Sequence, residues 1–255
     1  MRVNVVSDVH GNARDLARAG DGADVLVCLG DLVLFLDYQD SSGGIFASLF
    51  GAANAERLVA LRTAKRFDEA RTFSRDLWGS LTEDPKAVIE REVRAQYAAL
   101  FGVMPEPAYL TYGNVDVPRL WPDYAKAGHT VLDGQVVDIG GRTWGFVGGG
   151  LQTPMRTPYE VDDNTYAEKV AAVGAVDVLA CHIPPQVPGL LYDVEARRFE
   201  RGSEAVLDAI RDTQPELVLF GHVHQPLRSR VRIGRTECVN VGHFRGTGVP
   251  YVLEY

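Results

Sequence analysis

The stretch Val3-Asn4-Val5-Val6-Ser7-Asp8-Val9-His10 decides how this chain folds. Its first half is a short run of β-branched residues, which is typical of a buried strand, and its second half is an Asp-x-His pair directly after that strand. The same arrangement, an apolar run followed by polar residues, occurs four more times. The other runs are Val25–Leu29, Ala108–Tyr112, Val176–Ala180 and Leu217–Phe220.

Each of the five runs ends at residues that can bind a metal ion. These residues are Asp8, His10, Asp31, Asn114, His182, His222 and His224. The carboxyl ends of parallel strands share one edge of an α/β sheet, and ligands usually bind at that edge. A single Asp-x-His or Gly-Asp pair carries little weight, because such residues often close turns after strands. Five clusters after five strands favour a metal centre.

The residue types indicate an open site for two divalent ions. Histidine nitrogens with carboxylate and amide oxygens suit Mn, Fe, Zn, Ni or Co, and the chain has no thiolate cluster of the kind that holds structural zinc. We expect manganese first, with the other four as alternatives. Asp31 is the expected bridge, because a carboxylate has two oxygens and can hold two cations about 3.5–4 Å apart.

The ordered motifs resemble those of the calcineurin-like metallophosphoesterase superfamily. The motifs are Asp8-x-His10, Gly30-Asp31, Gly113-Asn114-Val115-Asp116, His182 and Gly221-His222-Val223-His224. The resemblance implies an α/β fold, a four-layer α/β/β/α sandwich of two mixed sheets with a dinuclear centre at one end. It implies one ion held by Asp8, His10, Asp31 and His224. It implies a second ion held by Asp31, Asn114, His182 and His222.

Val115 departs from the superfamily pattern, which commonly has a histidine that acts near the leaving group or on the phosphate. Valine cannot donate a proton, and general acid assistance is worth roughly 10²–10⁴-fold in many enzymes. We therefore expect a phosphodiesterase rather than a phosphomonoesterase. The candidate catalytic residues are Asn114 and His243, the latter as a substitute donor. A hydrogen-bonded turn histidine is the alternative for His243, and Asp116 is a candidate for orienting a ligand.

The expected reaction is hydrolysis of a small phosphate ester by a hydroxide that bridges the two ions and attacks phosphorus in line. The sequence contains no Gly-x-Ser-x-Gly motif, and we expect Cys181 to pack as a small apolar residue rather than act as a nucleophile. The alternative is a weak or inactive protein-interaction scaffold with the same fold. Val115 and a long helical stretch favour that alternative, whereas the full ligand set opposes it.

Composition sets the remaining expectations. The ligands span residues 8 to 224 of a 255-residue chain that is 46% hydrophobic, so we expect a single domain over residues 1–255. A net charge of −8 without a Lys/Arg block argues against an extended nucleic-acid surface. Three cysteines and the absence of a leader or a long apolar run favour a cytoplasmic protein without a membrane segment.

A helical insertion is expected at residues 45–101, between the second and third motifs, with Pro85 at the first position of a helix. It could form a lid, a surface for homo-oligomers or a packed layer, and the packed layer is the default. Other expected helices run from Asn12 to Gly20, Tyr159 to Val173 and Ser203 to Arg211. Strands are expected at Val131–Ile139 and Arg142–Val147, joined by a Gly140-Gly141 turn, with a hairpin at Val231–Thr236.

Overall fold

The computed structural model describes all 255 residues. They separate into a larger unit of Met1–Leu32 with Leu100–Tyr255 and a smaller unit of Val33–Ala99. The five strands that carry the polar motifs all belong to the larger unit. The centre of this protein is therefore assembled within one unit.

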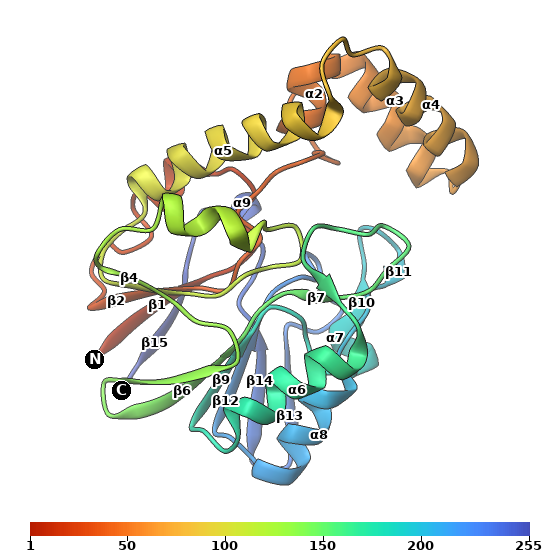
Figure 1. The fold of residues 1–255 in the computed structure, drawn as a ribbon. Coiled ribbons are helices and arrows are strands. Elements are labelled where there is room, and N and C mark those ends of the chain that lie inside the picture. The colour runs from red at the N-terminus through yellow and green to blue at the C-terminus, as the bar shows by residue number, and fades with distance from the viewer. The chain divides into compact units, whose positions relative to one another are not determined.

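Two mixed sheets form the larger unit (Figure 1). The first has the order β15-β1-β2-β3-β4 and the second the order β13-β14-β12-β9-β6-β5. The strands of the first sheet are β1 (Arg2–Val6), β2 (Val25–Cys28), β3 (Ala108–Leu110), β4 (His129–Val131) and β15 (Tyr251–Glu254). Those of the second are β5 (Gln135–Ile139), β6 (Arg142–Val147), β9 (Val178–Cys181), β12 (Leu217–Phe220), β13 (Arg230–Ile233) and β14 (Thr236–Asn240). The structure confirms the predicted sandwich of two mixed sheets.

Parallel pairing aligns the strands that carry the motifs. In the first sheet β1 pairs with β2 and β2 with β3, all parallel. In the second, β9 and β12 are also parallel neighbours. The edge strands β15, β13 and β5 run antiparallel to their neighbours. The carboxyl ends of β1, β2 and β3 therefore lie side by side, as do those of β9 and β12.

The core lies between the two sheets, and alternate residues of each strand contribute to it. In β9, Val178 and Ala180 belong to this core, whereas Leu179 and Cys181 belong to the cluster under the outer helices. This alternation follows from the two-residue period of a strand. All four residues are buried because both faces of the second sheet are covered. The continuous apolar runs in the sequence thus mark strands with no solvent-facing side.

Two helices cover the outer face of the second sheet, α6 (Asp163–Val173) and α8 (Glu204–Thr213) (Figure 1). Ser203 and Asp162 cap their first turns, because each side chain accepts a backbone N–H three residues further on. The prediction of a helix from Tyr159 was wrong at its start. Tyr159 lies in a turn, and Glu160 and Val161 are extended because β8 (Glu160–Val161) pairs with β7 (Gly150–Leu151).

Two further sequence predictions needed correction. Val131–Ile139 is not one strand: β4 ends at Val131, the chain turns at Gly134 with φ 71°, and β5 begins at Gln135 in the other sheet. The first helix, α1 (Ala13–Leu16), is capped by Asn12 as predicted but is shorter than predicted, and tight turns follow it. The hairpin of β13 and β14 formed as predicted.

The smaller unit is helical and has an apolar cluster of its own. Its helices are α2 (Gly44–Phe50), α3 (Ala52–Thr63), α4 (Phe67–Gly79) and α5 (Pro85–Val103), whose last turn belongs to the larger unit. Phe46, Ala55 and Leu58 are buried in that cluster, and Trp78 packs against it. Pro85 opens α5, as predicted. The short remaining elements are α7 (Pro188–Leu191), α9 (Phe244–Thr247), β10 (Tyr192–Asp193), β11 (Arg198–Phe199) and the 3₁₀ turn η1 (Pro118–Asp123).

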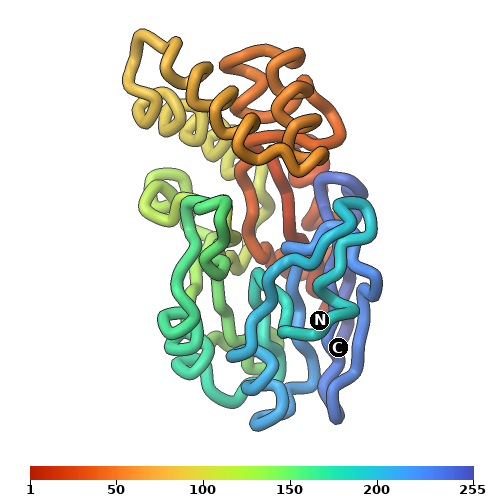
Figure 2. Tube along the Cα trace, turned by 90° about the vertical axis from the view of Figure 1, so that its right-hand side faces the viewer, coloured from red at the N-terminus to blue at the C-terminus, as the bar shows by residue number.

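The two ends of the chain meet at the same place. β1 and β15 pair antiparallel, so the N- and C-termini lie close together (Figure 2). The amino group of Met1 contacts the carbonyl oxygen of Tyr255. None of the helices combines the length and the apolar character that a membrane crossing requires.

Candidate metal centre

All seven predicted ligands lie in loops that directly follow strands. Asp8 and His10 follow β1, Asp31 follows β2, and Asn114 follows β3. The other three lie beyond the ends of two strands of the second sheet: His182 after β9, and His222 and His224 after β12. The structure brings these side chains together in two neighbouring groups.

The first group contains Asp8, His10, Asp31 and His224. The Nε2 atom of His10 lies 3.2 Å from Nε2 of His224 and 3.8 Å from Oδ2 of Asp31. It lies 3.9 Å from Oδ1 of Asp8, which is 3.5 Å from Nε2 of His224. Donor atoms that share one ion at about 2.0–2.2 Å lie roughly 3–4 Å from each other, depending on the angle between them at the ion. The four separations, 3.2 to 3.9 Å, therefore suit a shared cation.

The second group contains Asp31, Asn114, His182 and His222. The amide oxygen of Asn114 lies 3.1 Å from Nε2 of His182 and 2.9 Å from Nδ1 of His222. Nε2 of His182 lies 3.4 Å from Oδ2 of Asp31. Nδ1 of His182 donates to the carbonyl oxygen of Leu29 at 2.9 Å, which leaves the lone pair of Nε2 facing the group when the ring is neutral.

Asp31 belongs to both groups through a single oxygen. Its Oδ2 faces His10 and His182, whereas its Oδ1 accepts the backbone N–H of Val115 at 2.9 Å. The backbone of the third motif thus occupies Oδ1, and Oδ2 lies between the two groups.

The backbone at these loops is held in an unusual conformation. Asp8, His10, Asp31 and His222 have φ values of 57°, 40°, 56° and 68°. Few non-glycine residues adopt positive φ, and such strain collects at functional sites where the surrounding structure enforces it. Four of the eight positive-φ non-glycine residues in the chain are predicted ligands. The folded scaffold therefore orients these side chains before any ligand binds.

The glycines of the motifs are required because backbones approach closely at the site. A Cβ atom at Gly113 would lie 2.0 Å from Oδ1 of Asp31, and one at Gly30 would lie 1.9 Å from the backbone nitrogen of Gly113. A Cβ at Gly221 would lie 2.3 Å from Oδ2 of Asp8. The glycines of the Gly-Asp, Gly-Asn and Gly-His pairs thus lie where one loop contacts another too closely for a side chain.

Asp116 joins the loops after β2 and β3. Its carboxylate, which is fully buried, accepts the backbone N–H groups of Asp31 at 2.8 Å, Leu32 at 3.0 Å and Gly113 at 2.8 Å. Burial and the nearby charge of Asp31 raise the pKa of Asp116 to about 7 in the chain alone. Asp116 does not face the histidine groups but fixes the backbone that carries Asp31.

The electrostatics of the cluster favour added positive charge. Burial opposes protonation of His182, but the carboxylate of Asp31 outweighs it and raises the pKa of His182 to about 9. The pKa of His224 is raised as well, since the carboxylate of Asp8 outweighs burial. The pKa values of Asp8 and Asp31 are lowered although burial acts to raise them, because the histidines lie close. Bound divalent cations would supply the positive charge that the protonated histidines supply in the chain alone.

Two observations in the first group show whether the residues fit a metal ion. Oδ1 of Asp8 is buried and has no hydrogen-bond partner, although an unpaired carboxylate oxygen is costly to bury. Nε2 of His10 and Nε2 of His224 face each other, so their lone pairs need a shared proton or cation. A cation bound between these three atoms would satisfy all of them. The residues of the first group therefore fit a bound cation.

His243 lies beside the first group, but its orientation differs from that of a ligand. Its ring stacks on the ring of His224 with centroids 4.0 Å apart and planes 4° apart. The distances also group His243 with His10 and His224 as a candidate set. A metal binds an imidazole in the plane of the ring, and two stacked parallel rings cannot share one ion in that way. His243 therefore supports His224 from the side.

The site opens to solvent on the His224 side, where 40% of that side chain is exposed. His182 is fully buried, so the two groups differ in access to water.

Sequence reasoning missed several residues that hold the ligand loops. The side-chain amide of Asn240 donates to the carbonyl oxygens of Gly221 and Val223, and Arg245 donates to the carbonyl oxygen of His10 at 2.8 Å. Thr157 accepts the amide N–H of Asn114 at 3.0 Å. The only available signal was the position of Asn240 at the end of a strand.

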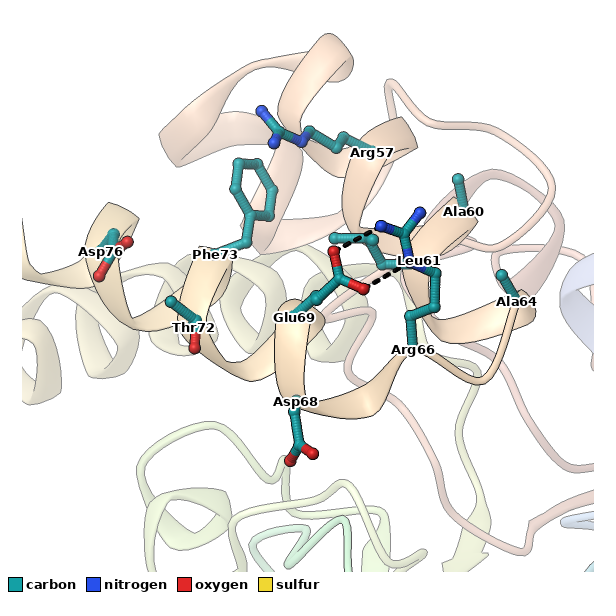
Figure 3. A pocket seen from close by; sticks show the side chains of 10 residues that line it. All are labelled: Arg57, Ala60, Leu61, Ala64, Arg66, Asp68, Glu69, Thr72, Phe73 and Asp76. Atoms are coloured by element: carbon teal, nitrogen blue, oxygen red, sulfur yellow. Dashed lines mark hydrogen bonds and ion pairs between the residues drawn. The ribbon is translucent and has the colours of Figure 1, made fainter.

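A hollow lies between α3 and α4 of the helical unit (Figure 3). It has a volume of about 770 Å³ and a rim of mixed charge, with Arg66 and Glu69 paired through two hydrogen bonds. The guanidinium of Arg57 lies 4.6 Å from the centre of the Phe73 ring. None of the seven predicted ligands lines this hollow.

Comparisons with known proteins agree with the fold. The family of calcineurin-like phosphoesterases matches residues 1–226. Among curated proteins, no significant match to the sequence was found. One similar crystal structure is 16% identical with a TM-score of 0.57, covering 95% of this chain and 91% of its own. The crystal structure of TT1561 of Thermus thermophilus is 13% identical with a TM-score of 0.52, covering 99% and 98%. At these identities the likeness concerns the fold alone.

Proposed function

The chain belongs to the calcineurin-like phosphoesterase family, and from this membership we propose that it hydrolyses small phosphodiesters with two divalent ions. The observation that carries the proposal is the position of Asp31. One oxygen of this carboxylate lies between a histidine of the first group and a histidine of the second, 3.8 Å from one and 3.4 Å from the other.

The two groups divide the ligands between the ions. In the proposal, Asp8, His10, Asp31 and His224 hold one ion. Asp31, Asn114, His182 and His222 hold the other. Manganese is the proposed metal, with iron, zinc, nickel or cobalt as alternatives that the same nitrogen and oxygen donors accept.

Bound divalent ions would lower the pKa of water and neutralise the charge that grows on phosphoryl oxygens. The residues of the chain supply orientation. The contact from His182 to Leu29 fixes which ring nitrogen faces the centre. The N–H of Val115 fixes which oxygen of Asp31 does so. The strained loops keep both groups preorganised, so little rearrangement is needed when substrate arrives.

Preference for diesters follows from the absence of a proton donor at Val115. A poor leaving group needs a proton in order to depart, whereas a leaving group that departs as a stabilised anion does not. His243 does not replace the donor in this proposal. Burial and the neighbouring His224 lower the pKa of His243 to about 4, so its ring is neutral at neutral pH and is a poor general acid there. Bound cations would lower this pKa further. The proposed role of His243 is to hold the ring of His224.

Hydrolysis of two nitrophenyl esters tests the proposal. With added Mn²⁺, we expect faster hydrolysis of bis(p-nitrophenyl) phosphate than of p-nitrophenyl phosphate, and loss of both activities in Asp31→Ala. Clear preference for the monoester would contradict the argument from Val115. Activity on neither ester at full metal occupancy would favour the scaffold alternative.

A further inference from the structure

A chain of hydrogen bonds leads from Asn114 away from the centre. The amide nitrogen of Asn114 donates to Oγ1 of Thr157 at 3.0 Å, and the hydroxyl of Thr157 donates to Oε1 of Glu160 at 2.8 Å. Asn114 is nine-tenths buried, and Thr157 and Glu160 are partly buried. This series of hydrogen bonds ends at the carboxylate of Glu160, the first residue of β8, which contributes no predicted ligand.

The direction of these hydrogen bonds is fixed by the carboxylate. An ionised carboxylate can only accept, so the single hydroxyl proton of Thr157 must point to Glu160. The oxygen of Thr157 then faces Asn114 with lone pairs and accepts only an N–H. The amide of Asn114 must therefore turn its nitrogen to Thr157 and its oxygen to His182 and His222.

Glu160 is itself held in place. Its Oε2 accepts the backbone N–H of Thr153 at 2.8 Å, and its Oε1 accepts the hydroxyl of Thr153 at 2.7 Å. Burial acts to raise the pKa of Glu160, but the hydrogen bonds from Thr153 and Thr157 outweigh it, so the pKa is lowered. The backbone of the same loop is tied to the third motif, because the N–H of Tyr159 donates to the carbonyl oxygen of Asn114 at 2.9 Å.

We propose that Thr157 and Glu160 are positioning residues that decide which end of the Asn114 amide faces the cation site. This inference rests on the proposed function, in which Asn114 is a ligand. Only the oxygen of an amide binds a divalent cation, so a flipped amide would present two N–H groups to the ion. The carboxylate of Glu160 thus acts on the centre through two hydrogen bonds.

Two substitutions test the role, and each disturbs the chain differently. Thr157→Val keeps the shape but removes the hydroxyl that selects the amide nitrogen. In Glu160→Gln, the oxygen of the new amide stays on the backbone N–H of Thr153, so its NH₂ group faces Thr157. The hydroxyl proton of Thr157 is then released toward Asn114, where it favours the flipped amide.

We expect both variants to bind one of two Mn²⁺ ions about 10–100-fold more weakly than the wild type, the usual effect of losing an outer partner of a ligand. Calorimetric titration with Mn²⁺ measures each affinity. The electron paramagnetic resonance spectrum should change from that of a coupled ion pair to that of a single ion. Thr157→Ser, which keeps the hydroxyl, should restore both readouts.

Thr165→Val is the matched control, because Thr165 also donates to a carboxylate, that of Asp162 at 2.9 Å, but has no contact with Asn114. It should bind two ions as the wild type does. Equal affinities in Thr157→Val, Glu160→Gln and wild type, with binding lost in Asp31→Ala, would overturn this inference and leave the proposed function standing. Equal loss in Thr165→Val would also overturn it. A wild type that binds none of Mn²⁺, Fe²⁺, Zn²⁺, Ni²⁺ and Co²⁺ would overturn both.

Discussion

At the scale of single residues, the centre is built from conformations that cost free energy. A positive φ at a non-glycine residue costs on the order of 1–3 kcal/mol of conformational free energy. Asp8, Asp31 and His222 all have positive φ. Hydrogen bonds from neighbouring loops hold these residues in place, for example from the N–H of His222 to Oδ2 of Asp8 at 2.9 Å. Strain at the ligands is what a preorganised metal site requires.

The raised pKa of His182 predicts how metal binding depends on pH. A folded pKa of about 9 means that both ring nitrogens of His182 carry a proton at pH 6 to 8 in the metal-free chain. A cation needs the unprotonated Nε2, so binding must release that proton. Affinity should therefore rise as pH rises toward 9, by up to about tenfold per pH unit for each proton released.

Calorimetric titration of the metal-free protein at pH 6, 7 and 8 measures this dependence. Repeating the titration in two buffers with different ionisation enthalpies counts the protons released. An affinity that falls with rising pH, or binding without proton release, would contradict the assignment of His182 as a ligand.

The residues named from the sequence were those whose chemistry shows in the pattern itself. Asp8, Asp31 and His182 follow strands, and strand ends are visible as the ends of apolar runs. Thr157 and Glu160 could not be found in this way, because their role depends on how the loop between β7 and β8 folds back on Asn114. The use of one oxygen of Asp31 likewise depends on the direction of a backbone N–H.

At the scale of elements, strands buried on both faces were predicted with mixed success, because β9 begins at Val178 and not at the predicted Val176. β12 has the expected bounds, Leu217–Phe220, because a continuous apolar run leaves little choice of register. The segment from Val131 to Ile139 was misjudged because both parts are extended and only the turn at Gly134 separates the two sheets. The start of α6 was misjudged because the pairing of β7 with β8 is not local in sequence.

The helical unit offers a prediction at the same scale. Its helices share a cluster around Phe46 and Leu58, so they have an apolar core of their own. Replacement of residues 33–99 by a short Gly/Ser linker should therefore leave two ions bound per chain, because all seven proposed ligands belong to the larger unit. If the helices select substrates, the ratio of diester to monoester hydrolysis should change.

Metal analysis and circular dichroism of the shortened protein measure these outcomes. The wild-type chain treated in parallel is the control. A shortened chain that fails to fold would show that the helices are needed as a packing layer, and it would contradict the prediction of an independent larger unit.

At the scale of the whole molecule, chain topology places the site. Parallel pairing in each sheet brings the ends of distant strands together, so residues 8 to 224 contribute to one cluster. The overall sandwich could be predicted because the motifs and their order specify it. A net charge of −8 does not oppose an anionic substrate in this account, since two bound cations dominate the field at the centre.

In the proposed function, two cations would lie on either side of Oδ2 of Asp31. Crystals grown with Mn²⁺ and measured at the manganese absorption edge test this arrangement most directly. We expect two anomalous peaks about 3.5–4 Å apart, one near His10 and His224 and the other near His182 and His222. A single peak, no peak, or peaks away from Asp31 would contradict it.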